Sequence, residues 1–172
     1  AKIADLDITT DRGVEVPKNI LTTDAMALIR ECDVVVELIG GVTKSKEFIL
    51  EALKLGKPVV TANKALLAEK GEEIFAAAEK SEADVYYEAS VAGGIPIIKS
   101  LREGFVGNRI NKIYGILNGT CNYILTRMER ENETFGTVLK DAQRLGYAEA
   151  NPALDVDGID TAHKAAILSS LA

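Results

Sequence analysis

Hydrophobic and polar positions follow two different patterns along the chain, and the change falls near residue 88. Up to that point short apolar runs alternate with amphipathic stretches, which is typical of βαβ units around a parallel sheet. The pattern predicts strands at 2–8, 33–39, 58–61 and 84–87 and helices at 43–55 and 63–80, the second N-capped by Asn63. The strand at 33–39 is the clearest buried one. The residues expected to face inward from the helices are Phe48, Ile49, Ala52, Leu53, Leu67, Ile74, Phe75 and Ala78.

The second half is predicted to be α+β in character. A glycine-containing turn leads into a helix at about 96–102, and a strand-like run follows at 109–117. Two amphipathic helices come next, then an acidic loop at 146–158 and a final helix that carries His163 and Lys164. The residues expected to face inward are Cys121, Ile124, Leu125, Met128, Phe135, Val138, Leu139 and Ala142. We therefore expect two domains, 1–87 and 88–172.

Composition narrows the class of protein. The 172 residues are 47% hydrophobic and 27% charged with 4 Pro, which indicates a globular protein and excludes disorder, collagen and coiled coil. The net charge of −6 argues against a nucleic-acid partner. Two distant cysteines and one histidine favour neither a disulfide framework nor a zinc site, and no apolar run is long enough to span a membrane. We expect a cytoplasmic protein and, because the chain starts at Ala1 inside a strand-like run, a segment of a longer one.

Two features lie where parallel strands end and ligands bind. Gly40 and Gly41 follow the 33–39 strand, although taken alone they are better explained as an ordinary strand-to-helix turn. Lys64 starts a helix, where a cation is unfavourable to the helix dipole, and the spacing leaves function and ordinary exposure equally open.

Two further features are weaker. Glu88 precedes a glycine-containing turn whose carbonyl groups, at Val91, Gly93 and Ile95, could hold a hard cation, although a tight turn without an ion is the simpler explanation. Asp5 and Asp7 could bind an adenosine ribose and Arg12 a 2′-phosphate, but a solvated strand end explains them as well.

The strongest cluster lies between Gly146 and Lys164. Asp160 and Lys164 are i and i+4 on one helix face, and Asp157 can cap that helix. Together with Glu149 and Asp155 the carboxylates suit an ammonium group, and a lysine held among them can donate a proton to a carbonyl oxygen. The alternative is an exposed salt bridge. Because Ala162, Ala165 and Ala166 indicate close packing, we expect these charges to be partly buried; His163 points elsewhere and is interpreted as structural.

Together these motifs resemble homoserine dehydrogenase. The resemblance runs in order over essentially the whole chain and rests on these segments: Val36-Glu-Leu-Ile-Gly-Gly41, Val60-Thr-Ala-Asn-Lys64, Tyr87-Glu-Ala-Ser-Val-Ala-Gly-Gly-Ile-Pro96, Leu117-Asn-Gly-Thr-Cys-Asn-Tyr-Ile-Leu125 and Gly146-Tyr-Ala-Glu149. It implies NAD(P)-dependent interconversion of L-homoserine and L-aspartate 4-semialdehyde in threonine, methionine and isoleucine biosynthesis. The implied fold is an incomplete Rossmann-like parallel sheet at 1–87, followed by a substrate-binding, catalytic and dimerisation domain at 88–172.

The resemblance also implies a role for each site residue. Lys64 and Lys164 would be the catalytic lysines, with Lys164 the proton donor. Glu149, Asp160, Asp155, Thr120 and Gly119 would bind substrate, while Gly40, Gly41, Lys64 and Gly146 would lie against the cofactor. Glu88 with the carbonyl groups of Val91, Gly93 and Ile95 would form a sodium-like monovalent cation site, and the enzyme would be a homodimer.

The chain departs from the family pattern in one respect, since it contains no GxGxxG loop for the cofactor pyrophosphate. Two alternatives therefore stay open: a non-catalytic substrate-binding and dimerising fragment, or another amino-acid dehydrogenase of related architecture. The sequence leaves open the choice between NAD and NADP.

Overall fold

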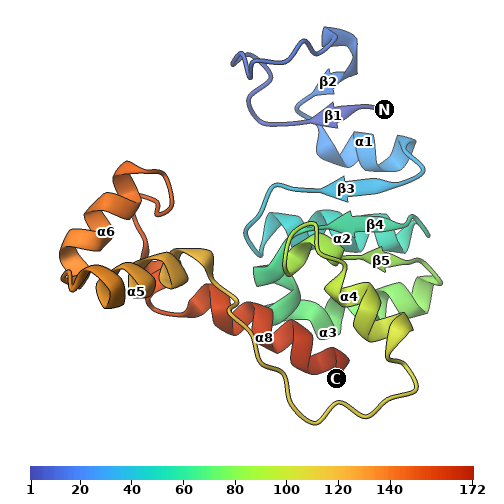
Figure 1. The fold of residues 1–172 in the computed structure, drawn as a ribbon. Helices are drawn as coiled ribbons and strands as arrows, with labels where there is room; N and C mark the ends of the chain where they lie inside the picture. Colours follow the sequence, from blue (N-terminus) through green and yellow to red (C-terminus); the bar gives the residue numbers. More distant parts are fainter. The chain divides into compact units, whose positions relative to one another are not determined.

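The chain folds into two compact units, Ala1–Ser90 and Val91–Ala172. The computed structural model describes residues 1–172, and its secondary-structure elements are labelled in Figure 1. No helix combines the length and the apolar character that crossing a bilayer requires.

The first unit begins with a two-stranded parallel sheet, formed by β1 (Ile3–Ala4) and β2 (Leu21–Thr22). A 3₁₀ turn at Lys18–Ile20 precedes β2, and α1 (Ala25–Glu31) follows it. The predicted strand at 2–8 is wrong in length, because the chain turns at Asp7, whose carboxylate accepts hydrogen bonds from the backbone amides of Thr9 and Thr10. Hydrogen bonds from Thr10 and then Thr9 hold the pKa of Asp7 far below its usual range.

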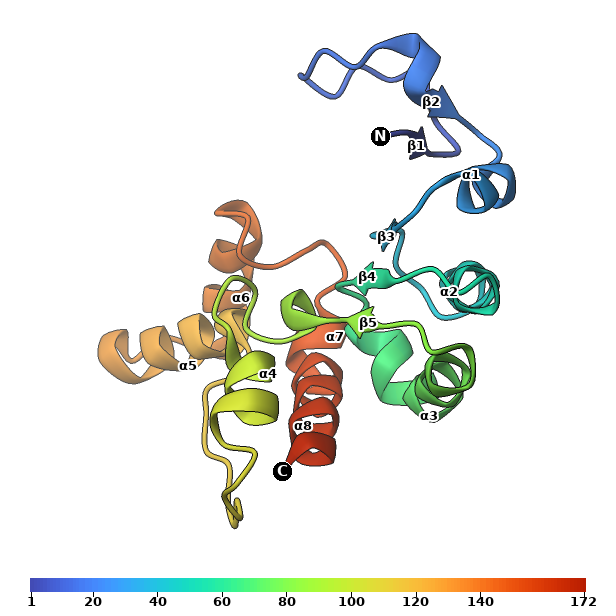
Figure 2. The same cartoon turned by 90° about the vertical axis from the view of Figure 1, so that its right-hand side faces the viewer.

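A three-stranded sheet forms the centre of the first unit. Its strands β3 (Val35–Glu37), β4 (Val59–Thr61) and β5 (Val85–Tyr86) are all parallel, in the order β3-β4-β5. Helices α2 (Lys44–Lys54) and α3 (Lys64–Ser81) connect them and cover one face (Figure 2). Between sheet and helices lie fully buried side chains, including Ile49, Leu53, Val59, Leu66 and Ile74. The predicted α/β class, the parallel sheet and the Asn63 cap, which accepts a hydrogen bond from the Leu66 amide, are confirmed.

The predicted burial of the 33–39 segment is wrong. Only three of its residues form a strand, and Val36, Leu38 and Ile39 are exposed. Val36 lies in register with Val60, and Val60 with Tyr86, so these exposed side chains share one face of the sheet. The helices cover the opposite face, toward which the neighbouring residue Glu37 points. Phe75, expected to be inward, is also partly exposed.

The second unit is helical. After the 3₁₀ turn Glu88–Ser90 that ends the first unit, α4 (Ile97–Lys99) continues as a π-helical turn, Ser100–Gly104. The predicted strand at 109–117 is wrong: this segment has no regular structure, and Ile113, Tyr114 and Ile116 are exposed. A strand exists only where another strand pairs with its backbone, and both sheets of this structure lie in the first unit.

Four helices complete the second unit: α5 (Gly119–Glu131), α6 (Phe135–Arg144), α7 (Ala153–Val156) and α8 (Ile159–Leu171). Helices α5 and α6 pack together around Ile124, Val138, Ala142 and Ala148 (Figure 1). Leu125 and Phe135 were expected in this core but are exposed. The predicted cap by Asp157 is also wrong, because Asp157 ends α7 and the left-handed Gly158 (φ 78°) precedes α8.

Candidate active site

Asp160 and Lys164 form an ion pair on one face of α8, as their spacing predicts. Lys164 Nζ donates to Asp160 Oδ2 over 2.7 Å and to the backbone oxygen of Leu117 over 2.6 Å. The Lys164 side chain is 19% exposed and that of Asp160 10% exposed. The expected partial burial of these charges is confirmed, although Ala162 and Ala166 beside them are exposed. This is not a solvated surface salt bridge, so each charge depends on its partners.

Asn118 belongs to the same cluster and was missed from the sequence. Its Oδ1 accepts a hydrogen bond from the Cys121 amide at the start of α5. Its Nδ2 donates to Asp155 Oδ1 over 2.7 Å and to Asp160 Oδ2 over 2.9 Å. A capping role is readable from an Asn before a helix, but these two contacts reach across 37 and 42 residues and have no local signal.

Two carboxylates lie close together in this cluster. Asn118 donates hydrogen bonds to both Asp155 and Asp160, and Lys164 pairs with Asp160. The effect is visible at Cys121, whose Sγ contacts the backbone oxygen of Asp155: burial first, and then the charges of Asp155 and Asp160, raise the pKa of the thiol. Such a pair of carboxylates suits a cationic ligand.

The other predicted substrate residues surround this cluster less tightly. Thr120, in the first turn of α5, donates its hydroxyl to the backbone oxygen of Tyr147 over 2.7 Å, and Gly119 beside it is exposed. Gly146 follows α6 in the left-handed conformation (φ 79°). Glu149 is exposed, and only its backbone oxygen is hydrogen-bonded, to Gln143. The structure therefore brings Asp155, Asp160 and Lys164 together and does not hydrogen-bond the Glu149 carboxylate to them.

In the first unit a buried carboxylate shapes the Gly40–Gly41 turn. Glu37, 4% exposed, accepts hydrogen bonds from the amides of Ile39 and Gly40 and from the Thr61 hydroxyl. Both glycines have positive φ angles of about 70°, and a Cβ on either would meet no atom of a residue beyond its chain neighbours within 4 Å. The Glu37 carboxylate thus fixes the turn on its buried side. On the other side the glycines leave room for a ligand to approach the backbone.

Asn63 joins this turn to the start of α3. Its Nδ2 donates to the backbone oxygen of Gly41 over 2.7 Å, and the next residue, Lys64, is the half-buried first residue of α3. The structure therefore brings Gly40, Gly41 and Lys64 to the same edge of the sheet, the one at which its parallel strands end.

The predicted cation loop falls at the junction of the two units. Glu88 is half-buried in the last turn of the first unit, and the second unit begins with Val91, which is buried. The loop turns through positive φ angles at Ala92 and Gly93, and the Ile95 carbonyl accepts a hydrogen bond from the Ile97 amide. No group of three or more His, Cys, Asp and Glu side chains is placed to hold a metal ion. A cation here would depend mainly on carbonyl oxygens.

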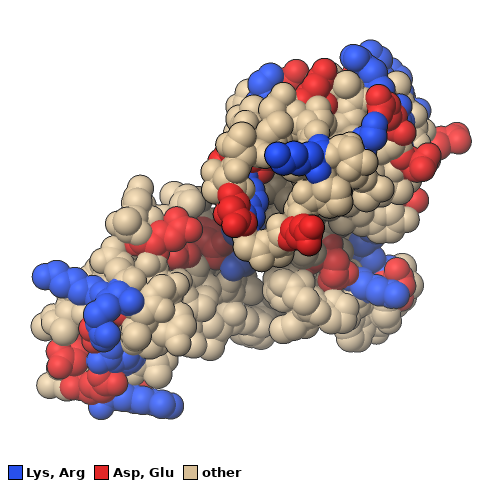
Figure 3. All heavy atoms as spheres, turned by 90° about the horizontal axis from the view of Figure 1, so that it is seen from above, with Lys and Arg blue, Asp and Glu red and all other residues tan.

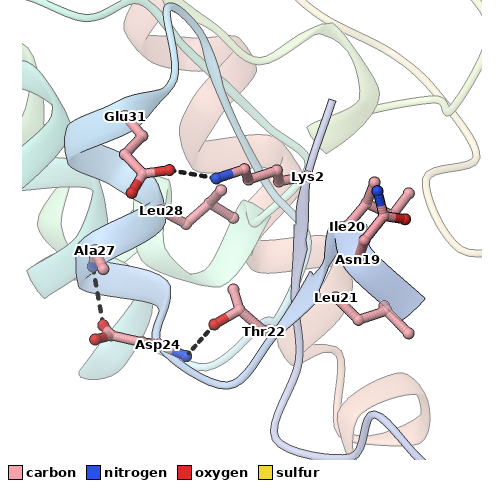
Figure 4. Close-up of a pocket in the computed structure, with 9 residues that line it drawn as sticks. All are labelled: Lys2, Asn19, Ile20, Leu21, Thr22, Asp24, Ala27, Leu28 and Glu31. Carbon is pink, nitrogen blue, oxygen red and sulfur yellow. Dashed lines mark hydrogen bonds and ion pairs between the residues drawn. The ribbon is translucent and has the colours of Figure 1, made fainter. Parts of the chain in front are cut away.

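Asp5 and Asp7, which follow β1, both contact Arg12. Arg12 donates to Asp5 Oδ2 over 2.9 Å and to the backbone oxygen of Asp7. Nearby, a hollow between β2 and α1 is lined by Lys2, Thr22, Asp24 and Glu31 among others, with Lys2 paired to Glu31 across it (Figure 4). This hollow contains none of the predicted site residues. Acidic and basic side chains are interspersed on the face seen in Figure 3, without a continuous basic patch.

Comparison with known proteins gives one family. Residues 1–88 match the sequence profile of the homoserine dehydrogenase NAD binding domain, and residues 96–172 match that of homoserine dehydrogenase. A homoserine dehydrogenase of Bacillus subtilis is 49% identical over 172 residues, which cover 99% of this chain and 40% of that protein. One of Pseudomonas aeruginosa is 58% identical over 142 residues, covering 83% of this chain and 33% of that protein.

Solved structures agree with the sequence comparison. The crystal structure of a Thiobacillus denitrificans homoserine dehydrogenase matches with a TM-score of 0.85 and 55% identity, over 87% of this chain and 35% of that one. A hyperthermophilic archaeal homoserine dehydrogenase in complex with NADPH matches with a TM-score of 0.80 and 32% identity, over 88% of this chain and 48% of that one. The chain spans at most about 40% of the length of the curated relatives named above. Its Rossmann-like parallel sheet matches these structures, and the chain belongs to the homoserine dehydrogenase family.

Proposed function

We propose that the protein carrying this chain catalyses NAD(P)-dependent interconversion of L-aspartate 4-semialdehyde and L-homoserine. The observation that carries the proposal is the lysine of α8, held by a buried carboxylate and a backbone oxygen in a chain of this family. An aldehyde oxygen that gains negative charge during reduction needs a fixed cationic donor nearby. Lys164 has the charge, the partial burial and the restraint for that role.

The first unit would supply part of the cofactor site. The open backbone at Gly40 and Gly41 leaves room for a ligand, and the match to an NAD binding domain supports a nicotinamide. NAD(P)H, when bound, supplies the hydride for the aldehyde carbon. Lys64 then lies at the edge of the sheet where the cofactor would bind, and we assign it the second catalytic role. Gly146 would approach the cofactor through its backbone.

Substrate recognition would depend on the carboxylates gathered near Lys164. Glu149, from its exposed loop, and Asp160 would hold the substrate's amino and hydroxyl groups, and Asp155 would support them. Thr120 and Gly119, at the start of α5, would line the junction of substrate and nicotinamide. Lys164 remains to protonate the aldehyde oxygen during reduction, or to take the proton back during oxidation.

The proposed enzyme would also bind a cation and form a dimer. Glu88 and the carbonyl groups of Val91, Gly93 and Ile95 would hold a sodium-like cation, and residues 88–172 would carry the dimer contact of a homodimer. The residues at 1–87 would form the cofactor domain. The reaction would serve threonine, methionine and isoleucine biosynthesis in the cytoplasm.

The test is an assay of the longer protein that carries this chain. We expect NADPH oxidation that depends on L-aspartate 4-semialdehyde, and NADP⁺ reduction that depends on L-homoserine. Activity with a different amino acid and none with homoserine would assign the protein to another amino-acid dehydrogenase.

A second candidate applies to the 172 residues alone. Because they lack the GxGxxG loop, this chain by itself would be a substrate-binding, dimerising fragment. Titration with NADPH, followed by nicotinamide fluorescence, separates the two. Saturable binding together with semialdehyde reduction favours the enzyme, and no binding favours the fragment.

A further inference from the structure

We propose that Asn118 is a positioning residue that sets the place of Lys164, acting through Asp160. The proposal deepens the proposed function and, as far as it concerns turnover, rests on it. Asn118 is 6% exposed, and each polar atom of its side chain is hydrogen-bonded within the second unit. The roles assigned above give Asn118 no contact with substrate or cofactor. Any effect of Asn118 on catalysis must therefore pass through its hydrogen-bond partners.

The orientation of the carboxamide is fixed by its surroundings. The Cys121 amide can only donate, so the atom facing it must be the side-chain oxygen. The two N–H groups then face the two carboxylates, which can only accept when ionised. A flipped carboxamide would place oxygen against two carboxylates and nitrogen against an amide N–H, so all three hydrogen bonds would be lost.

The same short segment restrains Lys164 by two routes. The backbone oxygen of Leu117 accepts directly from Lys164 Nζ. The side chain of the next residue, Asn118, holds Asp160 Oδ2, which is the other acceptor of that ammonium group. Residues 117 and 118 therefore fix the ammonium group from one side, and α8 fixes it from the other.

Among the residues that cap helices well, asparagine is the one that can also bridge two carboxylates. Serine, threonine and aspartate also cap helices through an oxygen, but serine and threonine have one O–H, and ionised aspartate has no donor at all. Only asparagine offers an acceptor for the helix and two donors for two separate carboxylates. Asn118→Ser keeps the cap and removes the bridge, which makes it the informative substitution.

The kinetic test uses the full-length protein with Asn118→Ser, compared with Thr134→Ser at the N-cap of α6, which contacts neither carboxylate. We expect Asn118→Ser to lower kcat by about tenfold or more, since small misplacement of a catalytic group has effects of this size. KM for NADPH should stay within about twofold of the parent value, a change too small to indicate altered binding energy. Thr134→Ser should change neither.

A double-mutant cycle distinguishes positioning from general loss of structure. In a Lys164→Met background the lysine is gone, so Asn118→Ser should have little further effect on kcat. Full additivity of the two substitutions would overturn the proposal, because Asn118 would then act independently of Lys164. Unchanged kcat in Asn118→Ser alone would overturn it as well.

A chemical measurement tests the positioning role of Asn118 without relying on the proposed function. Competitive acylation of lysines by acetic anhydride, quantified by peptide mass spectrometry, reports how readily each neutral lysine amine meets the reagent, and hydrogen bonds that hold the amino group in place slow the reaction. Lys57 is the internal reference, since its Nζ donates to the backbone oxygens of Ile29, Arg30 and Cys32 in the other unit. Asn118→Ser should raise the acylation rate of Lys164 severalfold relative to Lys57.

The outcomes of the two measurements are distinct. Faster acylation of Lys164 in a protein without semialdehyde reductase activity supports the positioning role and overturns only the function. An unchanged acylation rate overturns the positioning role whatever the activity. If Asn118→Ser fails to fold, Asn118→Thr replaces it, because threonine keeps the cap, offers a single O–H and adds no charge; the same increase is expected from it, and its absence has the same meaning.

Discussion

The carboxylate of Glu37 accepts a 2.7 Å hydrogen bond from the hydroxyl of Thr61, its register partner on the adjacent parallel strand. The other carboxylate oxygen of Glu37 accepts from the amides of Ile39 and Gly40, at 2.9 and 3.1 Å. One buried side chain thus ties the end of β3, the end of β4 and the turn expected to face the cofactor.

We predict that Glu37→Ala destabilises the protein by about 1–3 kcal/mol, because two amides and a hydroxyl lose their shared acceptor in a buried site. Glu37→Gln should cost less, since its oxygen can still accept from the amides. Urea unfolding followed by circular dichroism measures both. The control is Glu47→Gln, which removes the exposed Lys44–Glu47 ion pair and should change stability by less than about 0.5 kcal/mol. A Glu37→Ala variant as stable as this control would contradict the role assigned to Glu37.

Lys164→Ala should lower the turnover of the full-length enzyme by at least about a hundredfold, the usual range for a lost general acid. The assay is the rate of NADPH oxidation at saturating aspartate semialdehyde. Lys140→Ala, on the exposed side of α6, is the matched control and should leave turnover unchanged. Near-normal turnover in Lys164→Ala would remove this lysine from the catalytic role.

The contact between α5 and α6 predicts a pH dependence of stability. Arg127 donates to Glu131 on its own helix and to Asp141 on α6. Arg127, and for Asp141 also Arg144, hold the pKa values of both carboxyls below their usual range. Because the folded pKa values are lowered, this stabilisation is present above the unfolded pKa of about 4 and is lost as pH falls through the folded values.

The test compares urea unfolding of the parent protein and Arg127→Met between pH 7 and pH 2. The parent should lose stability on acidification more steeply than Arg127→Met, which lacks the cation. Arg130→Met, an exposed position in the last turn of the same helix, should behave like the parent. Equal pH dependence in all three proteins would show that the Arg127 contacts do not contribute.

Cys121 should react slowly with alkylating reagents. Burial and the charges of Asp155 and Asp160 raise the pKa of its thiol, and only the thiolate is a good nucleophile. Iodoacetamide labelling at pH 8, followed by peptide mass spectrometry, should be slower for Cys121 in the folded protein than in urea. Asp155→Asn should speed the folded-state reaction by removing one of the charges. Equal rates in folded and unfolded protein would contradict the raised pKa.

Local patterns predicted much of the fold because their physical causes are local. The helix at 44–54 follows from the spacing of Ile49, Ala52 and Leu53, and the start of α3 follows from the capping oxygen of Asn63. The i,i+4 contact of Asp160 and Lys164 needs only a helix. Each of these features depends on residues within about one turn of one another.

Features that failed or were missed depend on partners far along the chain. The 109–117 run has the apolar, β-branched character of a strand, but strand formation requires a second backbone, and this structure pairs none with it. The burial expected at 33–39 depends on which elements cover the sheet, and within the first unit α2 and α3 cover only one face. Glu37 lies inside that mispredicted strand, so its role was hidden by the apolar residues around it.

The α/β class of the first half, its helices at 43–55 and 63–80 and the resemblance to homoserine dehydrogenase could be predicted from the chain alone, because these features reside in short-range periodicity, caps and motifs. The helix α1 was not predicted. The three-dimensional packing was needed to show that Asn118 bridges Asp155 and Asp160, and that the Gly40–Gly41 turn is held by a buried carboxylate and by Asn63. Those contacts join residues up to 42 positions apart. A carboxamide does not reveal in sequence which carboxylates it will meet, because the packing of whole helices brings them within hydrogen-bonding distance.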